Sequence, residues 1–224
     1  MPVSRVPAQS RARDRPGLRK MSRNPSARAP RSEMGVGGML RGYPRDPSGL
    51  RYHPSMEYRA PCILVASPLL LDPNFIHSVV LVVEHDDQGA LGIILNRALP
   101  VTLSHICGES GLTYAGEDDA TAWRGGPVDP QRGILLVKGG MPGEEDTVLD
   151  FTHFVSHRKD LLEELFQDPR AQYRLFLGYA GWGPGQLDGE LEQKAWVRTP
   201  VHSEWLLHPE PRALWELAAH SPEA

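Results

Sequence analysis

Cysteine is scarce in this chain, where Cys62 and Cys107 are the only two among 224 residues. They form no CxxC pair, which excludes a zinc ribbon and a thioredoxin-type redox motif. Both lie in or at the end of an apolar run, so we expect two buried thiols in a reducing compartment. A disulfide or a redox-sensing thiol is the alternative.

Long apolar runs are also missing. No stretch of 18 apolar residues occurs, so we expect no membrane-spanning helix and no membrane partner. The N-terminus lacks the apolar segment of a secretory signal. It is Arg-rich and poor in acidic residues, as organelle transit peptides are, but its prolines oppose the amphipathic helix that such peptides form.

Charge is divided unevenly along the chain. Residues 1–59 hold thirteen Lys and Arg against four Asp and Glu, a net charge of +9, whereas the remainder holds eleven against twenty-four, a net charge of −13. Residues 1–58 are rich in Arg, Pro and Gly and poor in large apolar side chains, which predicts a disordered basic extension. It suits electrostatic contact with nucleic acid, although a solvated tail without a partner is favoured. Translation from Met56 would remove nearly all of it.

The pattern from residue 59 to 224 predicts one domain. Apolar runs predict strands, among them a hairpin over 79–95, and four helices are expected at 102–107, 156–168, 186–194 and 211–219. Thr102 and Ser156 are expected to begin helices and Gly108 to close one, with Leu214, Leu217 and Ala218 facing inward. The expected fold is α/β or α+β, with a mixed, largely antiparallel sheet flanked by helices.

Several ordered motifs resemble the AlgH/YqgE family. They comprise Ala66-Ser67-Pro68, Asp72-Pro73-Asn74-Phe75, Ser78-Val79-Val80, Glu84-His85, Gly89-Ala90-Leu91-Gly92, Asn96-Arg97, Gly125-Gly126-Pro127-Val128, and Gly178 to Leu187 with Glu190. They span about residues 60–215. The resemblance implies a bacterial, cytoplasmic protein without established enzymatic activity, and some members are linked genetically to transcriptional control of exopolysaccharide production.

The glycine-rich segment Gly178–Gly185 is the most suggestive of these motifs. It is expected to be a loop between a strand and a helix, where a phosphate-binding loop would lie. However, no P-loop Lys follows, and Asp188 and Glu190 would repel a phosphate. A structural turn, with Trp182 packed and Gln186 bonded to nearby backbone, is favoured, and a partner-binding groove is the next alternative.

Other motif residues have structural and functional interpretations. Asn96 is suited to close a strand by bonding loop backbone, and Arg97 to an ion pair or an anion. A cleft would form if the glycine-proline turn lay beside the Trp182 loop. The candidate ligand- or partner-binding residues are therefore Asn96, Arg97, Gly125, Gly126, Pro127, Gly181, Trp182, Gly185, Gln186 and Glu190.

The sequence predicts no catalytic residue, cofactor or metal site. Asp150, His153 and His157 have helical metal-ligand spacing, but His153 precedes the expected helix start at Ser156. No nucleophile stands in a recognised catalytic motif. The favoured hypothesis is a regulatory module that binds a protein partner. The alternatives are a small-ligand sensor or enzyme using Gly178–Gly185, and a nucleic-acid-associated transcriptional regulator, which the acidic domain disfavours.

Overall fold

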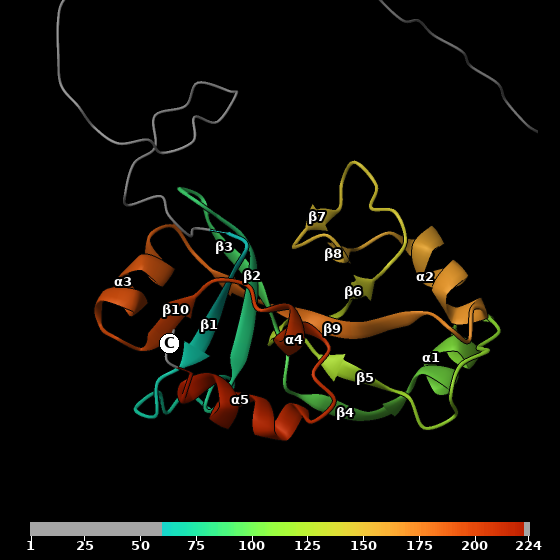
Figure 1. Ribbon diagram of the computed structural model, residues 1–224, viewed down its shortest axis with the longest axis horizontal. Helices are drawn as coiled ribbons and strands as arrows, with labels where there is room; N and C mark the ends of the chain where they lie inside the picture. Colours follow the sequence, from blue (N-terminus) through green and yellow to red (C-terminus); the bar gives the residue numbers. More distant parts are fainter. Residues whose placement is uncertain (1–59, 222–224) are drawn as a thin grey trace, which may run out of the picture. The chain divides into compact units, whose positions relative to one another are not determined.

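The computed structural model describes residues 60–221, which belong to one compact unit (Figure 1). The predicted extension over residues 1–58, with Met56, lies outside the described residues. The strands are β1 (Cys62–Ala66), β2 (Val79–Asp86), β3 (Gly89–Ile94), β4 (Ala98–Thr102), β5 (Thr121–Arg124), β6 (Val128–Lys138), β7 (Thr147–Val148), β8 (His153–Ser156), β9 (Gln172–Trp182) and β10 (Trp196–Thr199). The helices are α1 (Leu103–Glu109), α2 (Lys159–Gln167), α3 (Gln186–Glu192), α4 (Ser203–Leu206) and α5 (Pro211–Ala219).

The strands form a ten-stranded sheet with the order β10-β1-β2-β3-β9-β6-β8-β7, to which β4 and β5 attach alongside β9. Each pairing is antiparallel except that of β5 with β9. The long strand β9 joins the two parts of the sheet, because its C-terminal end pairs with β3 and its N-terminal end with β6 (Figure 1). The predicted α+β fold with a mixed, largely antiparallel sheet is confirmed.

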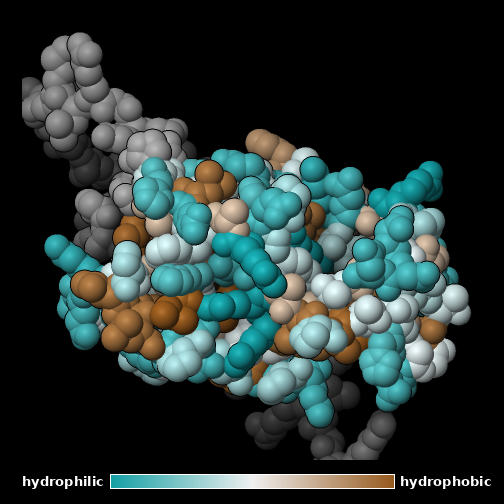
Figure 2. Space-filling view, turned by 90° about the horizontal axis from the view of Figure 1, so that it is seen from below, coloured by the Kyte–Doolittle hydropathy of each residue, from teal (hydrophilic) through white to brown (hydrophobic). Residues whose placement is uncertain are grey.

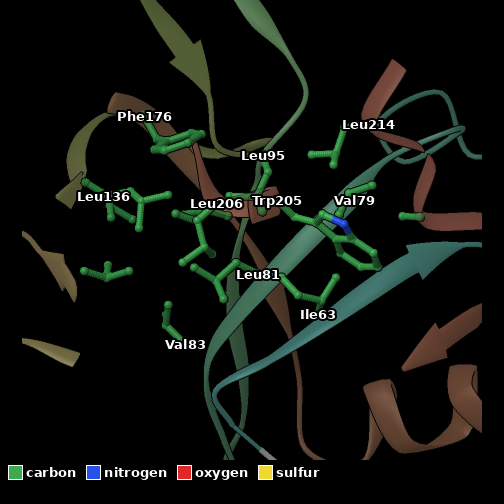
Figure 3. Packing of buried hydrophobic residues seen from close by; sticks show 14 of the residues in the cluster. Ile63, Val79, Leu81, Val83, Leu95, Leu136, Phe176, Trp205, Leu206 and Leu214 are labelled. Atoms are coloured by element: carbon green, nitrogen blue, oxygen red, sulfur yellow. The ribbon is translucent and has the colours of Figure 1, made fainter. Parts of the chain in front are cut away.

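Strands β1 and β2 are buried on both faces, which explains their uninterrupted apolar runs. Ile63 and Leu81 point into a core that Trp205 of α4 and Leu214 of α5 close (Figure 3). Alternate residues such as Leu64 pack on the opposite face with Leu187 of α3 and with Trp182 and Trp196. The strand period of two therefore divides one apolar run between two cores.

A third core lies at the other part of the sheet. It joins Leu103 and Cys107 of α1 to Phe166 of α2 and Phe154 of β8. Both cysteines are buried, as predicted, and burial raises the pKa of the Cys62 thiol to about 11 against a smaller lowering effect of Arg198. Among the described residues, no helix has the length and apolar character needed to cross a membrane.

Several boundaries differ from the predicted ones. Ser156 ends β8, and α2 begins at Lys159, because Ser156 completes the antiparallel pairing with Leu135. Helix α1 has the predicted cap at Thr102 but continues past Gly108 to Glu109. Leu217 on α5 is 48% exposed, whereas Leu214 and Ala218 are buried. The predicted hairpin over 79–95 and the helix over 211–219 are confirmed.

The segment Gly178–Gly185 is a loop only at its end. Gly178 to Trp182 belong to β9, where Ala180 and Trp182 pair with β3, so only Gly183 to Gly185 separate the strand from α3. The C-terminal part of β9 could not be predicted from residue propensities, because it contains glycines and glycine is depleted in strands. The extended phosphate-binding loop that the sequence suggested is therefore not formed.

Candidate functional site

Asn96 and Arg97 hold the segment that precedes β2 against the end of β3. The Asn96 side chain accepts a hydrogen bond from the Val79 N–H at 3.0 Å and donates one to the His77 carbonyl at 2.9 Å. The Arg97 guanidinium donates to the Ile76 carbonyl. Both side chains thus satisfy backbone groups of a loop, and the ion pair favoured for Arg97 is not among the contacts of residues 60–221.

The turn of Gly125, Gly126 and Pro127 lies directly against the backbone of β9. The Gly125 N–H donates to the Leu177 carbonyl at 2.9 Å, and the Gly125 carbonyl accepts from Ile94 at 2.8 Å. A Cβ on Gly126 would lie 2.1 Å from the Tyr179 carbonyl carbon. The two glycines therefore permit a close approach of main chains, while Pro127 is exposed beside them.

Trp182, Gln186 and Glu190 form one hydrogen-bond network with Trp196. The Glu190 carboxylate accepts from the indole nitrogens of Trp182 at 3.0 Å and Trp196 at 2.8 Å. It also accepts from the Gln186 amide at 2.9 Å, and Gln186 in turn accepts from the Gly183 N–H at 3.1 Å. The predicted bond of Gln186 to nearby backbone is thus confirmed. Gly185 stands in the left-handed region at a φ of 69°, as the N-cap of α3.

The ten predicted residues therefore occupy three places. Gly181 lies in β9 opposite Leu91, on an exposed part of the strand. Trp182, although only 6% exposed, borders a hollow of about 240 Å³ with Glu84, Asp86, Gln88, Gly89, Ala90 and Leu91. None of the other nine predicted residues lines that hollow. Two carboxylates border it, which makes it unfavourable for a phosphate.

A different surface, which the sequence did not indicate, surrounds the hairpin of β7 and β8. Met141, Val148 and Phe151 are 86%, 54% and 109% exposed. Val148 and Phe151 line a cavity of about 600 Å³ with Gly140, Pro142, Leu149, Asp150, Thr152, His153 and Phe154. Met141 lines a neighbouring cavity of about 710 Å³, which shares Gly140 and Phe154 with the first. We call these three residues and the two cavities the hairpin surface.

Exposed apolar residues also occur elsewhere. Figure 2 shows one face of the molecule, on which hydrophobic residues gather in separate groups among hydrophilic ones. Leu69 and Leu71, between β1 and β2, are 86% and 76% exposed. Single exposed apolar residues are normal on a protein surface. The hairpin surface is distinguished by apolar side chains that border cavities of ligand-binding size.

The hairpin is held in one conformation by Asp150. Its carboxylate accepts hydrogen bonds from the backbone N–H groups of Thr152 and His153, both at 2.7 Å, and from the Ser203 hydroxyl of α4 at 2.6 Å. The His153 Nδ1 atom lies 2.9 Å from the same carboxylate. Burial acts to raise the pKa of Asp150, but the bonds from Ser203, Thr152 and His153 outweigh it and hold this pKa well below its usual range.

The loop that carries Met141 is fixed by a second carboxylate. The Asp146 side chain is fully buried, accepts from the Gly143 N–H at 2.7 Å, and lies 3.4 Å from the Arg158 Nε atom. The surroundings are acidic, because residues 139–170 hold eight Asp and Glu against three Lys and Arg. The hairpin surface therefore combines a fixed backbone, exposed apolar side chains and a net negative charge.

Comparison with known proteins places this architecture in a family. The family model described as DUF179, AlgH-like, matches residues 63–223. The chain belongs to the AlgH-like family. A UPF0301 protein of Myxococcus xanthus is 40% identical over 162 residues, which cover 72% of this chain and 89% of that protein. A UPF0301 protein of Streptomyces coelicolor is 40% identical over 158 residues, covering 68% and 81%.

Solved structures agree with this assignment. The solution structure of the AlgH protein from Pseudomonas aeruginosa matches with a TM-score of 0.61 and 31% identity, covering 76% of this chain and 91% of that chain. A crystal structure of a Corynebacterium diphtheriae protein matches with the same TM-score of 0.61 at 22% identity, which shows a shared fold. The resemblance deduced from the motifs is thus confirmed for this AlgH-like chain.

The motifs and the hairpin surface of this AlgH-like domain lie in different parts of the sequence. Most motif residues described above satisfy backbone groups or allow main chains to approach each other. The hairpin surface comes from residues 139–154, where Asp150-Phe151-Thr152 has the composition of an ordinary turn. Its one sequence signal is a large aromatic residue, Phe151, at a turn position.

Proposed function

We propose that this AlgH-like domain is a partner-binding module and that it docks its partner on the hairpin surface. The observation that carries the proposal is the exposure of Phe151 at the tip of a hairpin whose backbone is fixed by Asp150. Because the backbone beside Phe151 is already fixed, a partner that covers the ring has to order the side chain alone and not the loop that carries it. Aromatic residues in such positions dominate the energetics of many interfaces.

The charge of the domain indicates the chemistry of the partner. Residues 60–224 carry a net charge of −13, and eight of the eleven charged residues within 139–170 are acidic. A protein segment with a large apolar side chain flanked by Lys or Arg complements this surface. The same charge opposes a nucleic acid, so we assign the docking surface to a protein.

The residues around Trp182 are less suited to bind a partner than the hairpin surface, because their polar groups are already bonded to each other. The indole nitrogen of Trp182 and the amide of Gln186 already bond to Glu190 within the domain. A partner that engaged these groups would first have to break those bonds. The regulatory role and the cytoplasmic location that the family resemblance implies remain part of the proposal, with regulation acting through the bound partner.

Selection from a random peptide library displayed on phage tests this function with the full chain as bait. Enriched peptides should contain a large apolar residue beside Lys or Arg. Their affinity should fall at least about tenfold for Phe151→Asp, since a central aromatic contact contributes 1–2 kcal/mol or more. The matched control is Leu69→Asp, which adds the same charge at a residue that is 86% exposed. Peptides that bind Phe151→Asp as well as the wild type would refute the proposal.

A further inference from the structure

We propose that the cavity of about 600 Å³ in the hairpin surface receives a tyrosine side chain of the partner, whose hydroxyl donates a hydrogen bond to the Nε2 atom of His153. This inference rests on the proposed function and names the residue that the partner inserts. It is carried by the position of His153, which lines this cavity while being only 4% exposed.

The contacts of His153 define which ring nitrogen is available. Nδ1 lies 2.9 Å and 3.1 Å from the two Asp150 oxygens and 3.0 Å from the Thr152 hydroxyl. A carboxylate accepts hydrogen bonds and does not donate them, so the proton of the neutral ring resides on Nδ1. Nε2 then carries a lone pair and is the acceptor.

Nε2 is also the ring nitrogen left without a protein partner. None of the hydrogen bonds described for residues 60–221 includes it. Some side-chain nitrogen and oxygen atoms of these residues are fully buried and lack a hydrogen-bond partner, and His153 Nε2 is not one of them. It therefore remains accessible. An acceptor that is accessible through the cavity, on a ring fixed by Asp150, is suited to select a ligand with a donor at the matching position.

The cavity walls limit what that ligand can be. Val148, Leu149, Phe151 and Phe154 supply an apolar lining around the imidazole. Asp150 also lines the cavity, but its carboxylate oxygens already accept hydrogen bonds from Thr152, His153 and Ser203. The remaining apolar walls disfavour the ammonium of lysine, and serine has no apolar body with which to fill them. Phe151 is fully exposed whereas His153 is buried, so the acceptor lies deep and the aromatic residue at the rim. Tyrosine matches this order, since its ring is apolar and its hydroxyl lies at the far end.

Binding of N-acetyltyrosinamide and N-acetylphenylalaninamide to the full chain tests the inference, because the two probes differ by the hydroxyl alone. We divide the association constant of the tyrosine probe by that of the phenylalanine probe. This ratio should be about fivefold higher for the wild type than for His153→Phe, because one hydrogen bond contributes about 1 kcal/mol. The exposed residue His157 provides the matched control, and His157→Phe should keep the wild-type ratio. An equal ratio in wild type and His153→Phe, or tighter binding of N-acetyltryptophanamide than of the tyrosine probe, would overturn the inference.

A measurement on the unmodified protein covers the case in which His153→Phe does not fold. Long-range ¹H–¹⁵N NMR spectra should show His153 protonated on Nδ1, with an Nε2 resonance that moves on addition of the tyrosine probe but not of the phenylalanine probe. No movement of Nε2 would overturn the inference. If peptides depend on Phe151 without preferring tyrosine, the tyrosine pocket is wrong and the docking surface stands. If tyrosine selectivity appears without Phe151-dependent peptide binding, the proposed function is the part that fails.

Discussion

At the scale of single residues, close approach of main chains explains the glycine-proline motif. Gly125 and Gly126 pack on the backbone of Gly178 and Tyr179, and Gly178 itself adopts a φ of 73°. The sequence indicated a glycine-proline turn that would line a cleft if it lay beside the Trp182 loop, but it did not identify the backbone of β9 as the neighbour of this turn. The contact joins segments about fifty residues apart, and no local pattern encodes such a distance.

Gly126→Ala should destabilise the domain by about 3 kcal/mol or more, because its methyl group would overlap the main chain of β9, which cannot move aside easily. Urea unfolding followed by tryptophan fluorescence measures this change. Gly108→Ala is the control, since a Cβ there meets nothing within 4 Å on a helix, and it should stabilise by about 0.5–1 kcal/mol. Equal effects of the two substitutions would contradict the assigned role of Gly126.

Glu190→Leu should cost about 2–4 kcal/mol of unfolding free energy, because it leaves the indole N–H groups of Trp182 and Trp196 without their acceptor. Thermal unfolding monitored by circular dichroism gives the value. The control is Glu192→Leu, at the exposed last residue of α3, which should change the free energy of unfolding by less than about 0.5 kcal/mol. A Glu190 variant as stable as the Glu192 variant would show that the network is not structural.

At the scale of elements, strand pairing overrode local signals. Ser156 has a good side chain for a helix cap, yet it completes β8 because Leu135 pairs with it. The glycines of β9 weakened the strand pattern, whereas pairing with β3 and β6 determines its length. Elements with a clear apolar pattern were predictable: β1 is an uninterrupted apolar run, and α5 has apolar residues at helical spacing.

Ser203→Ala should loosen the β7–β8 hairpin, because it removes the hydrogen bond that joins α4 to Asp150. Amide exchange at residues 150–153 should accelerate roughly threefold to tenfold, corresponding to the 0.5–1.5 kcal/mol of one hydrogen bond. Exchange in β1 and β2 should stay unchanged, because these strands pair only with each other, β3 and β10 and make no bond to Ser203 or Asp150. Uniform acceleration across the domain would mean that the bond contributes to global stability and not to the hairpin.

The same carboxylate makes hairpin stability depend on pH. The native pKa of Asp150 is depressed, so its hydrogen bonds stabilise the hairpin fully above the ordinary aspartate pKa of about 4, and this contribution is lost as the pH falls toward the native value. Hairpin protection measured between about pH 6 and pH 3 should therefore decline in the wild type and less in Asp150→Asn. A wild-type hairpin whose protection is constant over that range would contradict the assignment.

At the scale of the whole molecule, charge separates a basic N-terminal part from an acidic domain. The charge distribution was readable from the sequence, as was the family, because both depend on residue identity alone. The hairpin surface could not be predicted from the sequence, because the exposure of Phe151 and the burial of His153 depend on how β8, α2 and α4 pack. The proposed docking surface is thus one that only the folded chain displays.

Binding of a selected basic-apolar peptide should weaken as salt rises from about 0.05 to 0.5 M, since charges separated by more than a Debye length become screened. Binding should remain measurable at the high-salt end, because the apolar contact with Phe151 is not screened. Isothermal titration calorimetry follows both effects. Affinity that is independent of salt would contradict an electrostatic contribution to binding.

We propose that partners dock on the hairpin surface and not at the motif residues around Trp182. Chemical-shift mapping of a selected peptide on the ¹⁵N-labelled full chain tests it most directly. The largest shifts should fall on residues 139–154, while the indole N–H signals of Trp182 and Trp196 should stay in place. Shifts concentrated on Trp182, Gln186 and Glu190, with residues 139–154 unaffected, would contradict it.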